Sequence, residues 1–292
     1  MIKIGNVLVG RSSPVRVMGI INVSPESFYK GSIKTTTRSI AQYAATMEQA
    51  GAQLIDIGAM STAPYLENNI SVQEEIKRMK RAVKIVRTNC NIAVSADTPR
   101  SAVAKEAVDL GVDCLNDVTG LKYDSNMAGI VAESNLPVII GAYGRIGRIY
   151  SQPKLIPTGK MSSTIRLLNE SLAIARKMGI KKCKIIIDPS VGFFRAKGKN
   201  PFFTIIRDMP WYIRDIEIIS RLRELATDFS NPICISVSRK SFIGKLLDLK
   251  IEERLIPSLV FEIISALNGA KIIRTHNVKE TVHALTICGL MH

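Results

Sequence analysis

The stretch IAVSADTPRSAVAKEAVDLGVDCLND, residues 92–117, contains one complete unit of the expected fold. It begins and ends with short apolar runs, 92–97 and 114–117, and both runs close on polar residues, as buried parallel strands often do. Between them, residues 101–111 place apolar positions at helical spacing and end at Gly111, which suits a helix C-cap. This order predicts a β/α unit, in which a helix connects two parallel strands.

The same alternation is repeated along the chain. Glycine precedes several strand-like runs, as at Gly51, Gly111 and Gly269, where we expect it to end a helix. The strand-like runs are 15–23, 54–58, 92–97, 114–117, 137–141, 184–188, 233–237 and 271–275. Parallel strands in this number, joined by right-handed crossovers, predict an α/β fold, a single (β/α)8 TIM barrel over residues 1–292. A doubly wound open sheet of similar length is the alternative.

The opening segment IKIGNVLVG lies outside this repeat. Its Gly5-Asn6 pair between apolar residues is typical of a hairpin turn, so we expect a short N-terminal β-hairpin within residues 1–13, ahead of the barrel. The chain has 292 residues, of which 46% are hydrophobic and 22% charged, close to an ordinary globular protein. A (β/α)8 barrel usually has about 250 residues, so the length fits one domain.

The spacing of the cysteines and the hydropathy of the chain indicate the cellular compartment. The five cysteines are far apart and form no C-x-x-C pair, so neither a zinc site nor a disulfide framework is predicted. No apolar run approaches the roughly 18 residues of a membrane span, and the first residues do not resemble a signal peptide. We therefore expect a soluble protein of the reducing cytoplasm.

The charge balance favours anionic partners without naming them. Lys and Arg number 40 against 25 Asp and Glu, a formal net charge of +15. The basic run at 77–84 falls on a helical pattern and is interpreted as a solvated helix face. A basic nucleic-acid-binding protein is one alternative function, but no such module is visible and aromatic residues make up only 5% of the chain.

Polar residues close almost every predicted strand. Any one of them could simply cap the following helix. In a barrel, however, the carboxyl ends of the strands share one rim, where active sites of this fold lie. Carboxylates and an amide can bind a flat heterocycle with several donors, while Arg, Lys and His can bind a polyanion. The residues in question are Asn22, Asp97, Asn116, Asp117, Asp188, Ser238, Arg239, Lys240, Arg274 and His276.

Several of these residues belong to longer motifs. They are N-V-S-P-E-S-F (22–28), D-I-G-A-M-S-T-A-P (56–64), A-D-T (96–98), N-D-V-T-G (116–120), D-P-S-V-G-F (188–193), S-R-K-S-F-I-G (238–244) and R-T-H-N-V (274–278). In this order, and over nearly the whole chain, they resemble the dihydropteroate synthase family. The resemblance implies a TIM-barrel transferase that condenses 6-hydroxymethyl-7,8-dihydropterin diphosphate with an arylamine and releases pyrophosphate, usually as a homodimer.

The resemblance also assigns roles to residues. It implies that the pterin is bound by Asp97, Asn116, Asp188 and Lys240. It places Asn22, Arg274 and His276 at the diphosphate and its Mg²⁺, with Asn22 as the protein ligand of the metal. It places Ser61, Thr62, Phe193, Arg239 and Ser241 near the arylamine. Catalysis is expected to rest on Asn22, Lys240, Arg274 and His276, which stabilise the departing diphosphate.

The loops depart from the family pattern on the arylamine and diphosphate side. The second loop usually reads like G-E-S-T-R-P-G, but here Ala59, Met60 and Ala63 leave it without an acidic and a basic residue. The first loop has Glu26 where Asp is usual, followed by Tyr29 and Lys30. Lys30 is a candidate for the missing positive charge. These changes leave it open whether the chain keeps full activity.

The same departures raise the question of the acceptor. After the fifth strand, where His-Met is typical, the chain reads Gly141 to Arg145, and Arg148 follows. Arg145 and Arg148 would suit an additional phosphate, so the acceptor is either 4-aminobenzoate or a ribofuranosyl aminobenzene phosphate of methanopterin assembly. Two further alternatives are a pterin-binding methyltransferase domain with a corrinoid partner, and a barrel that has kept the fold but lost the reaction.

Overall fold

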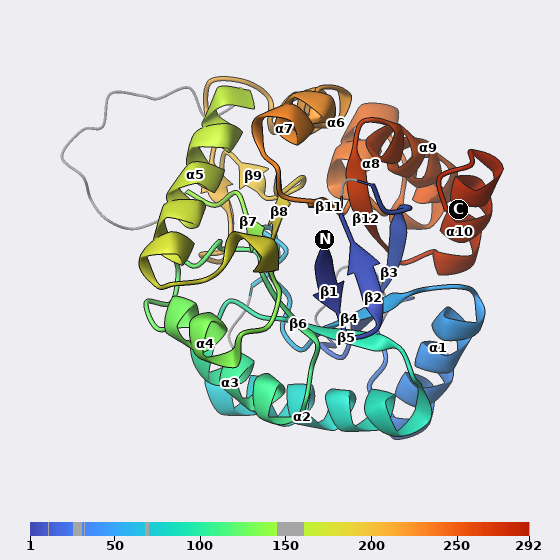
Figure 1. Cartoon of the computed structure of the whole chain (residues 1–292). Helices are drawn as coiled ribbons and strands as arrows, with labels where there is room; N and C mark the ends of the chain where they lie inside the picture. Colours follow the sequence, from blue (N-terminus) through green and yellow to red (C-terminus); the bar gives the residue numbers. More distant parts are fainter. Residues whose placement is uncertain (11, 26–30, 32, 68–69, 145–160, 292) are drawn as a thin grey trace.

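A computed structural model describes the chain except for residues 11, 26–30, 32, 68–69, 145–160 and 292. In the described part, parallel strands close into one barrel in the order β11-β12-β3-β4-β5-β6-β7-β8 (Figure 1). The ladder between β8 and β11 completes the ring, which excludes the open-sheet alternative. The barrel strands are β3 (Arg16–Asn22), β4 (Leu54–Gly58), β5 (Ala93–Asp97), β6 (Cys114–Asp117), β7 (Val138–Gly141), β8 (Ile185–Asp188), β11 (Ile233–Ile235) and β12 (Ala270–Thr275). Each falls within or overlaps a predicted run, and the predicted TIM barrel is confirmed.

Helices surround the barrel, as the alternating pattern predicted. Their ends follow ordinary capping chemistry: Ser71 accepts a hydrogen bond from the backbone N–H of Glu74 at the start of α2. The helices are α1 (Thr37–Gln49), α2 (Val72–Asn89), α3 (Ser101–Asp109), α4 (Met127–Ser134), α5 (Met161–Lys177), α6 (Trp211–Ser220), α7 (Leu222–Asp228), α8 (Ser241–Leu247), α9 (Leu255–Leu267) and α10 (Val278–Ile287). Because each helix buries one apolar face on the sheet, the main core lies between the strands and the helices.

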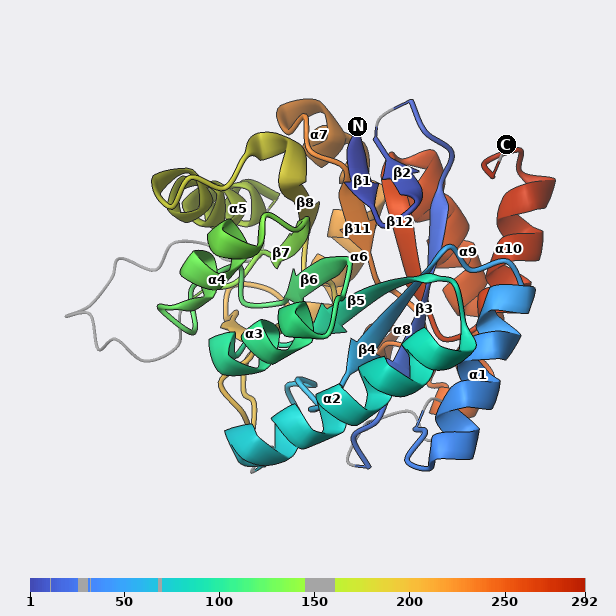
Figure 2. The same ribbon diagram turned by 60° about the horizontal axis from the view of Figure 1, so that its bottom comes forward.

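The predicted N-terminal hairpin closes one end of the barrel. Strand β1 (Ile2–Ile4) pairs antiparallel with β2 (Val7–Val9), as Gly5-Asn6 indicated. Its apolar residues form a second core with inward-facing barrel residues such as Met18 and Leu54. Figures 1 and 2 show the hairpin lying across this end of the barrel. The opposite end of the barrel, where the strands finish, is not covered by the hairpin and is the place where a functional site can lie.

Four small elements in the described part of the chain were not predicted from the sequence. After β8, the strands β9 (Phe194–Arg195) and β10 (Thr204–Ile205) pair in parallel outside the barrel. Short 3-10 helices, η2 (Lys182–Lys184) and η3 (Ile251–Arg254), precede β8 and α9. They matter because β9 contains Arg195, and because carbonyls of η3 accept hydrogen bonds from Arg239.

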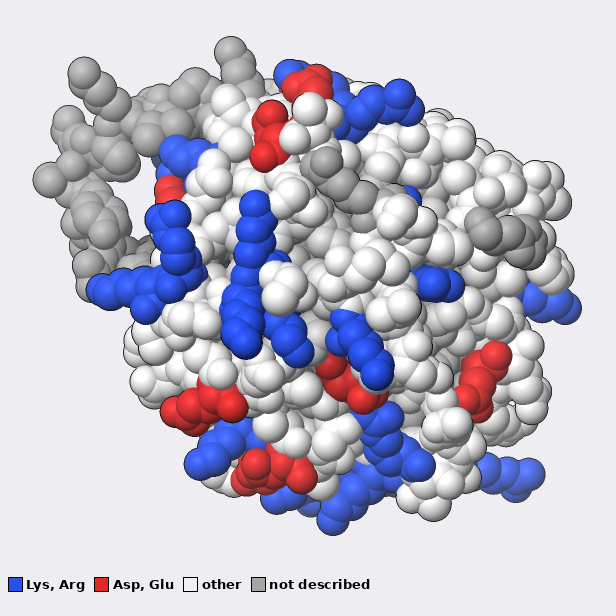
Figure 3. Space-filling model, viewed as in Figure 1, with Lys and Arg blue, Asp and Glu red and all other residues white. Residues whose placement is uncertain are grey.

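The surface carries the basic excess in a dispersed form on the face seen in Figure 1. There, Lys and Arg side chains are interspersed with Asp and Glu (Figure 3). No helix among the described residues is both long and apolar enough to cross a membrane.

Candidate active site

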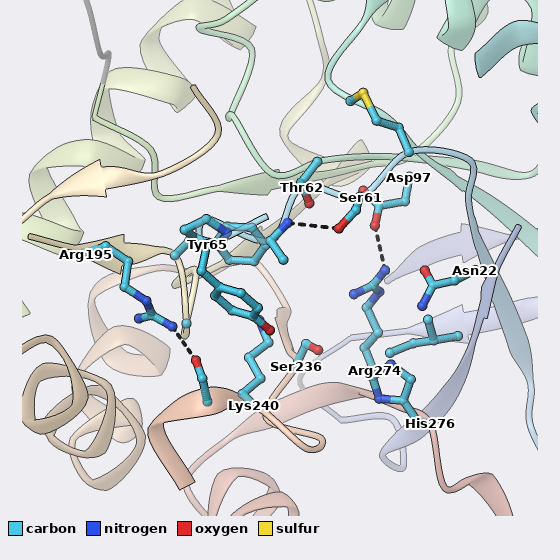
Figure 4. Close-up of a pocket in the computed structure, with 17 residues that line it drawn as sticks. Asn22, Ser61, Thr62, Tyr65, Asp97, Arg195, Ser236, Lys240, Arg274 and His276 are labelled. Atoms are coloured by element: carbon cyan, nitrogen blue, oxygen red, sulfur yellow. Dashed lines mark hydrogen bonds and ion pairs between the residues drawn. The ribbon is translucent and has the colours of Figure 1, made fainter. Parts of the chain in front are cut away.

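A pocket lies at the carboxyl ends of the barrel strands, opposite the hairpin, and Figure 4 shows the side chains that line it. Side chains reach it from the ends of β3, β5 and β12 and from the loops after β4, β8 and β11. Nine of the residues assigned by the resemblance line it, namely Asn22, Ser61, Thr62, Asp97, Phe193, Lys240, Ser241, Arg274 and His276. The barrel therefore gathers residues more than 250 positions apart around one hollow.

Arg274 lies on the floor of this pocket between two carboxylates. Its Nε donates to Oδ2 of Asp56 and its Nη2 to Oδ2 of Asp97, both at 2.6 Å. Burial raises the pKa of Asp97, and the positive charge of Arg274 counteracts this rise. The guanidinium is thereby held in the pocket by the fully buried Asp56 on one side and the half-buried Asp97 on the other.

Asp56 also holds Asn116, which does not itself line the pocket. The Asn116 amide donates from Nδ2 to Asp56 Oδ2 at 3.0 Å. Asp56 is fully buried, and the sequence analysis assigned it no role because it lies inside the apolar run LIDIG. A carboxylate in the middle of a buried strand was the signal that could have identified it, since such a group needs charged or donor partners.

Lys240 crosses the pocket beside the loop that follows β8. Its Nζ donates to the carbonyl of Val191 at 2.5 Å and lies 4.5 Å from the centre of the Phe193 ring. Gly192 makes this path possible, because a Cβ at that position would lie 2.6 Å from the Lys240 side chain. Burial lowers the pKa of Lys240 to about 8, although the nearby Asp188 carboxylate opposes this shift.

Asp188 ends β8 just beneath the pocket lining. Its Oδ1 accepts a hydrogen bond from the backbone N–H of Ser190 at 2.6 Å. Burial raises its pKa, and the charge of Lys240 is the largest effect in the opposite direction. Asp188 and Lys240 therefore form an electrostatic pair at one side of the site, as Asp97 and Arg274 do at the other.

His276 lies among the basic residues expected at the diphosphate, and its surroundings disfavour the protonated imidazole. Burial lowers its pKa to about 3, and the positive charges of Arg274, Arg239 and Lys240 add to this effect. Its Nδ1 lies 3.1 Å from the hydroxyl of Ser238, whose Oγ also accepts the His276 backbone N–H. The imidazole can thus serve the pocket as a hydrogen-bonding group, while Lys240 and Arg274 supply positive charge.

Arg239 is placed differently from the expectation that it approaches the arylamine. It does not line the pocket among the described residues. Its backbone is left-handed (φ 52°), and its Nη1 donates to the carbonyls of Ile251 and Glu252 in η3, at 2.9 and 3.0 Å. The side chain therefore turns away from the pocket and holds the segment ahead of α9.

Residues that the sequence analysis did not single out complete the wall. Arg195, on β9, and Tyr65, from the second loop, lie side by side at the end of the pocket near Ser241 (Figure 4). Ser236 also lines it. The β9–β10 pairing brings Arg195 into place, and a two-residue strand has no detectable periodicity. Glu26, Tyr29, Lys30, Arg145 and Arg148 lie outside the described residues.

Comparisons with known proteins agree on one family. A family model described as pterin binding enzyme matches residues 18–276. Dihydropteroate synthase type-3 of Escherichia coli is 31% identical over 272 residues, which are 93% of this chain and 97% of that protein. The dihydropteroate synthase of Escherichia coli K12 is 33% identical over 93% of this chain and 89% of its own length.

Solved structures show the same likeness. The Yersinia pestis dihydropteroate synthase, solved as a sulfonamide drug complex, has a TM-score of 0.81 and 31% identity, covering 99% of this chain and 97% of that chain. A dihydropteroate synthase from Coxiella burnetii, solved in complex with pteroic acid, has a TM-score of 0.79 and 30% identity, covering 95% of this chain and 93% of that chain.

Proposed function

The chain belongs to the dihydropteroate synthase family of pterin-binding enzymes, and we propose that the rim pocket is where it joins 6-hydroxymethyl-7,8-dihydropterin diphosphate to an arylamine. It is a transferase, and pyrophosphate is the second product. One observation carries the assignment of the site. The half-buried acids Asp97 and Asp188 and the half-buried cations Lys240 and Arg274, all from the family motifs, meet at one end of a closed barrel.

The pterin ring lies against the acidic and amide side of the floor. Carboxylates accept hydrogen bonds from the ring amino and N–H groups, and Lys240 and Asn116 donate to its oxygen and ring nitrogens. The pterin-binding residues are Asp97, Asn116, Asp188 and Lys240. Asn116 and Asp188 lie just behind the pocket lining, so a flat ring that penetrates to the floor would reach them.

The diphosphate lies toward Arg274, with Asn22 and His276 beside it. We propose that Mg²⁺ enters with the substrate and takes the Asn22 side-chain oxygen as its protein ligand, because Mg²⁺ prefers hard oxygen donors and substrate phosphates. The bound ion would neutralise charge on the departing pyrophosphate. An Asn22→Ala variant should need a higher Mg²⁺ concentration for half-maximal activity, and an unchanged requirement would argue against this ligand.

The reaction needs no nucleophilic side chain. The bond from the pterin methylene carbon to the diphosphate oxygen breaks with cationic character at carbon, and the amine nitrogen forms the new bond and then releases a proton. The protein holds both reactants in line and stabilises the leaving anion with Lys240 and Arg274. Neutral His276 can donate or accept one hydrogen bond there without competing for the positive charge.

The acceptor is proposed to be an arylamine with an anionic group, with 4-aminobenzoate as the first choice. The second candidate is a ribofuranosyl aminobenzene phosphate, because the second loop departs from the family pattern at Ala63 and because Arg145 and Arg148, which lie outside the described residues, would suit an additional phosphate. Measuring turnover with each amine distinguishes these two candidate acceptors. Equal or better use of 4-aminobenzoate would remove the case for the phosphate-bearing acceptor and for a place in methanopterin assembly.

Pyrophosphate release tests the function directly. We expect the purified protein to release pyrophosphate from the pterin diphosphate only when an arylamine is present, and Lys240→Ala or Asp188→Ala to abolish it. A methyltransferase would release none, and a barrel that has lost the reaction would bind the pterin without turnover. Binding unchanged in both variants would show that the pterin lies elsewhere.

The homodimer is also a proposal, supported by an apolar stripe on α9. Ile256, Val260 and Leu267 are 73%, 52% and 53% exposed, and Ile264 lies between them on the same face at 36%. Contiguous exposed apolar side chains of this kind usually mark an interface. The absence of a nucleic-acid partner and the cytoplasmic location stay predictions.

A further inference from the structure

Arg195 stands at the end of the pocket where Ser241 begins α8. Although its side chain lines the pocket, Arg195 is only 6% exposed, and several contacts restrain it. Its guanidinium stacks over Trp211 at 3.6 Å from the ring centre, and Nη1 donates to the carbonyl of Phe194 at 2.8 Å. This arginine is therefore held in one orientation before any ligand binds.

The most informative contact is with Ser241. Nη2 of Arg195 donates to Ser241 Oγ at 2.6 Å (Figure 4). A guanidinium has donors only, so the serine oxygen must be the acceptor, and its own O–H points away from Arg195. Because Ser241 lines the pocket, that hydroxyl is available to donate to a ligand. Arg195 thus polarises and orients a donor at this end of the site.

The charges behind Arg195 leave a positive excess. Asp215 is fully buried and lies 3.8 Å from Arg195, but it lies closer to Arg214, at 3.2 Å. Its Oδ2 also accepts the backbone N–H of Gly192 at 3.0 Å. One carboxylate is therefore shared by two arginines, so this cluster has one positive charge more than it has negative charge. The second loop has Ala63 where the family pattern has an arginine. The positive charge at this end of the pocket therefore comes from Arg195 on β9.

We propose that Arg195 is a specificity-determining residue, which orients the Ser241 hydroxyl and selects arylamines that carry an anionic group opposite the amine. This inference rests on the proposed function and deepens it. The recognised chemistry is a carboxylate or phosphate oxygen, which accepts the Ser241 proton and is attracted by the guanidinium. A neutral group at the same place could accept the hydrogen bond but would gain nothing from the charge.

The test compares a charged and a neutral acceptor. We would measure kcat and KM for 4-aminobenzoate and for 4-aminobenzamide, with pyrophosphate release at saturating pterin diphosphate. Arg195→Met removes the charge at similar length, and Arg195→Lys keeps the charge but not the rigid fork. Lys197→Met is the matched control, because it removes one exposed cation from the same loop. If the amide is not turned over, its inhibition constant replaces KM.

Arg195→Met should raise KM for 4-aminobenzoate by about ten-fold or more, which is what loss of a charge-assisted contact produces. Its constants for the amide and for the pterin diphosphate should change less than about two-fold, since those ligands do not use the charge. Arg195→Lys should be intermediate, and Lys197→Met should match the unaltered enzyme.

Equal losses for acid and amide, or a comparable rise in KM for the pterin, would overturn the inference and leave Arg195 a general support of the loop. Equal use of acid and amide by the unaltered enzyme would also overturn it. If the unaltered enzyme releases no pyrophosphate with any arylamine, the proposed function itself fails. Thermal unfolding of each variant identifies one that has lost its fold, in which case Arg195→Lys decides.

Discussion

Burial shifts the pKa values of single residues in the pocket, and Lys240 gives the clearest pH dependence. Its pKa is lowered to about 8 by burial, so it is charged below that pH and loses its proton as pH rises through it. Loss of this charge should lower the affinity for the pterin diphosphate by up to about ten-fold per pH unit above pH 8. Calorimetric titration between pH 6 and 9.5 measures this, and Lys240→Met should not show it.

Asp56 is the second residue whose replacement is informative. It is fully buried and accepts hydrogen bonds from Arg274 and Asn116, so Asp56→Asn keeps the shape but removes the charge that faces Arg274. Breaking a buried pair from one side typically costs about 3 kcal/mol. We expect a loss of that order in the free energy of unfolding, measured in urea, together with weaker pterin binding. Unchanged stability would mean that Asp97 alone can hold Arg274.

The residue scale also shows what could be predicted from the sequence. Strand-end residues such as Asp97, Lys240 and Arg274 could be predicted, because the barrel fixes where strands end. Asp56 was missed, because a carboxylate inside an apolar run counts as part of the strand, although its need for buried partners was a usable signal. Arg195 depends on a pairing between β9 and β10 that leaves no periodic pattern, and the direction of Arg239 depends on its left-handed backbone.

At the scale of elements, α9 packs a carboxylic acid against α10. Glu262 is 1% exposed and accepts the Thr281 hydroxyl at 2.7 Å. Burial raises its pKa from 4.5 to about 7, so the folded state binds this proton more tightly than the unfolded state does. Its contribution to stability is therefore complete below pH 4.5 and is lost as the pH rises toward 7.

Glu262→Gln removes this titration while keeping an oxygen for Thr281. The unaltered protein loses stability from this titration between pH 5 and pH 8, and the variant does not. The unfolding free energy of the variant minus that of the unaltered protein should therefore increase from pH 5 to pH 8 by an amount on the order of 2 kcal/mol, since one pKa unit corresponds to about 1.4 kcal/mol. Urea unfolding at both pH values gives the difference. If the difference in unfolding free energy between the two proteins is the same at pH 5 and pH 8, Glu262 is ionised in the folded state throughout.

The exposed stripe on α9 predicts an association that one charge should break. Val260→Asp places a carboxylate at its centre, where Val260 is 52% exposed, so the change should not disturb the fold. We expect sedimentation equilibrium to give a dimer for the unaltered chain and a monomer for this variant. Val72→Asp, at an exposed position on α2, is the control and should stay dimeric. A monomeric unaltered chain would refute the interface.

Helical spacing and strand length explain why most elements could be predicted and a few could not. Helices such as α2 and α3 could be predicted because their apolar residues recur at regular intervals in the sequence. By contrast, β9, β10 and η3 have two to four residues each, and their positions are decided by tertiary contacts. Arg195, which was missed at the acceptor end, lies on one of these short elements, and Tyr65, also missed, lies in the second loop.

For the whole molecule, closure of the barrel is what turns separate motifs into a site. The hairpin and its apolar residues fill one end, which leaves the carboxyl ends of the strands as the open rim. Single polar residues at strand ends have ordinary explanations, but a ring brings all of them to one place. The order of the strands could be predicted from their number and spacing, whereas the loops over the rim could not.

A crystal structure of the protein with the pterin diphosphate and Mg²⁺ tests the central claim most directly. We predict density for the ring against Asp97, Asn116, Asp188 and Lys240, with the diphosphate reaching Arg274 and Asn22. A pterin bound anywhere other than this pocket, with these side chains arranged as they are without ligand, would contradict the account.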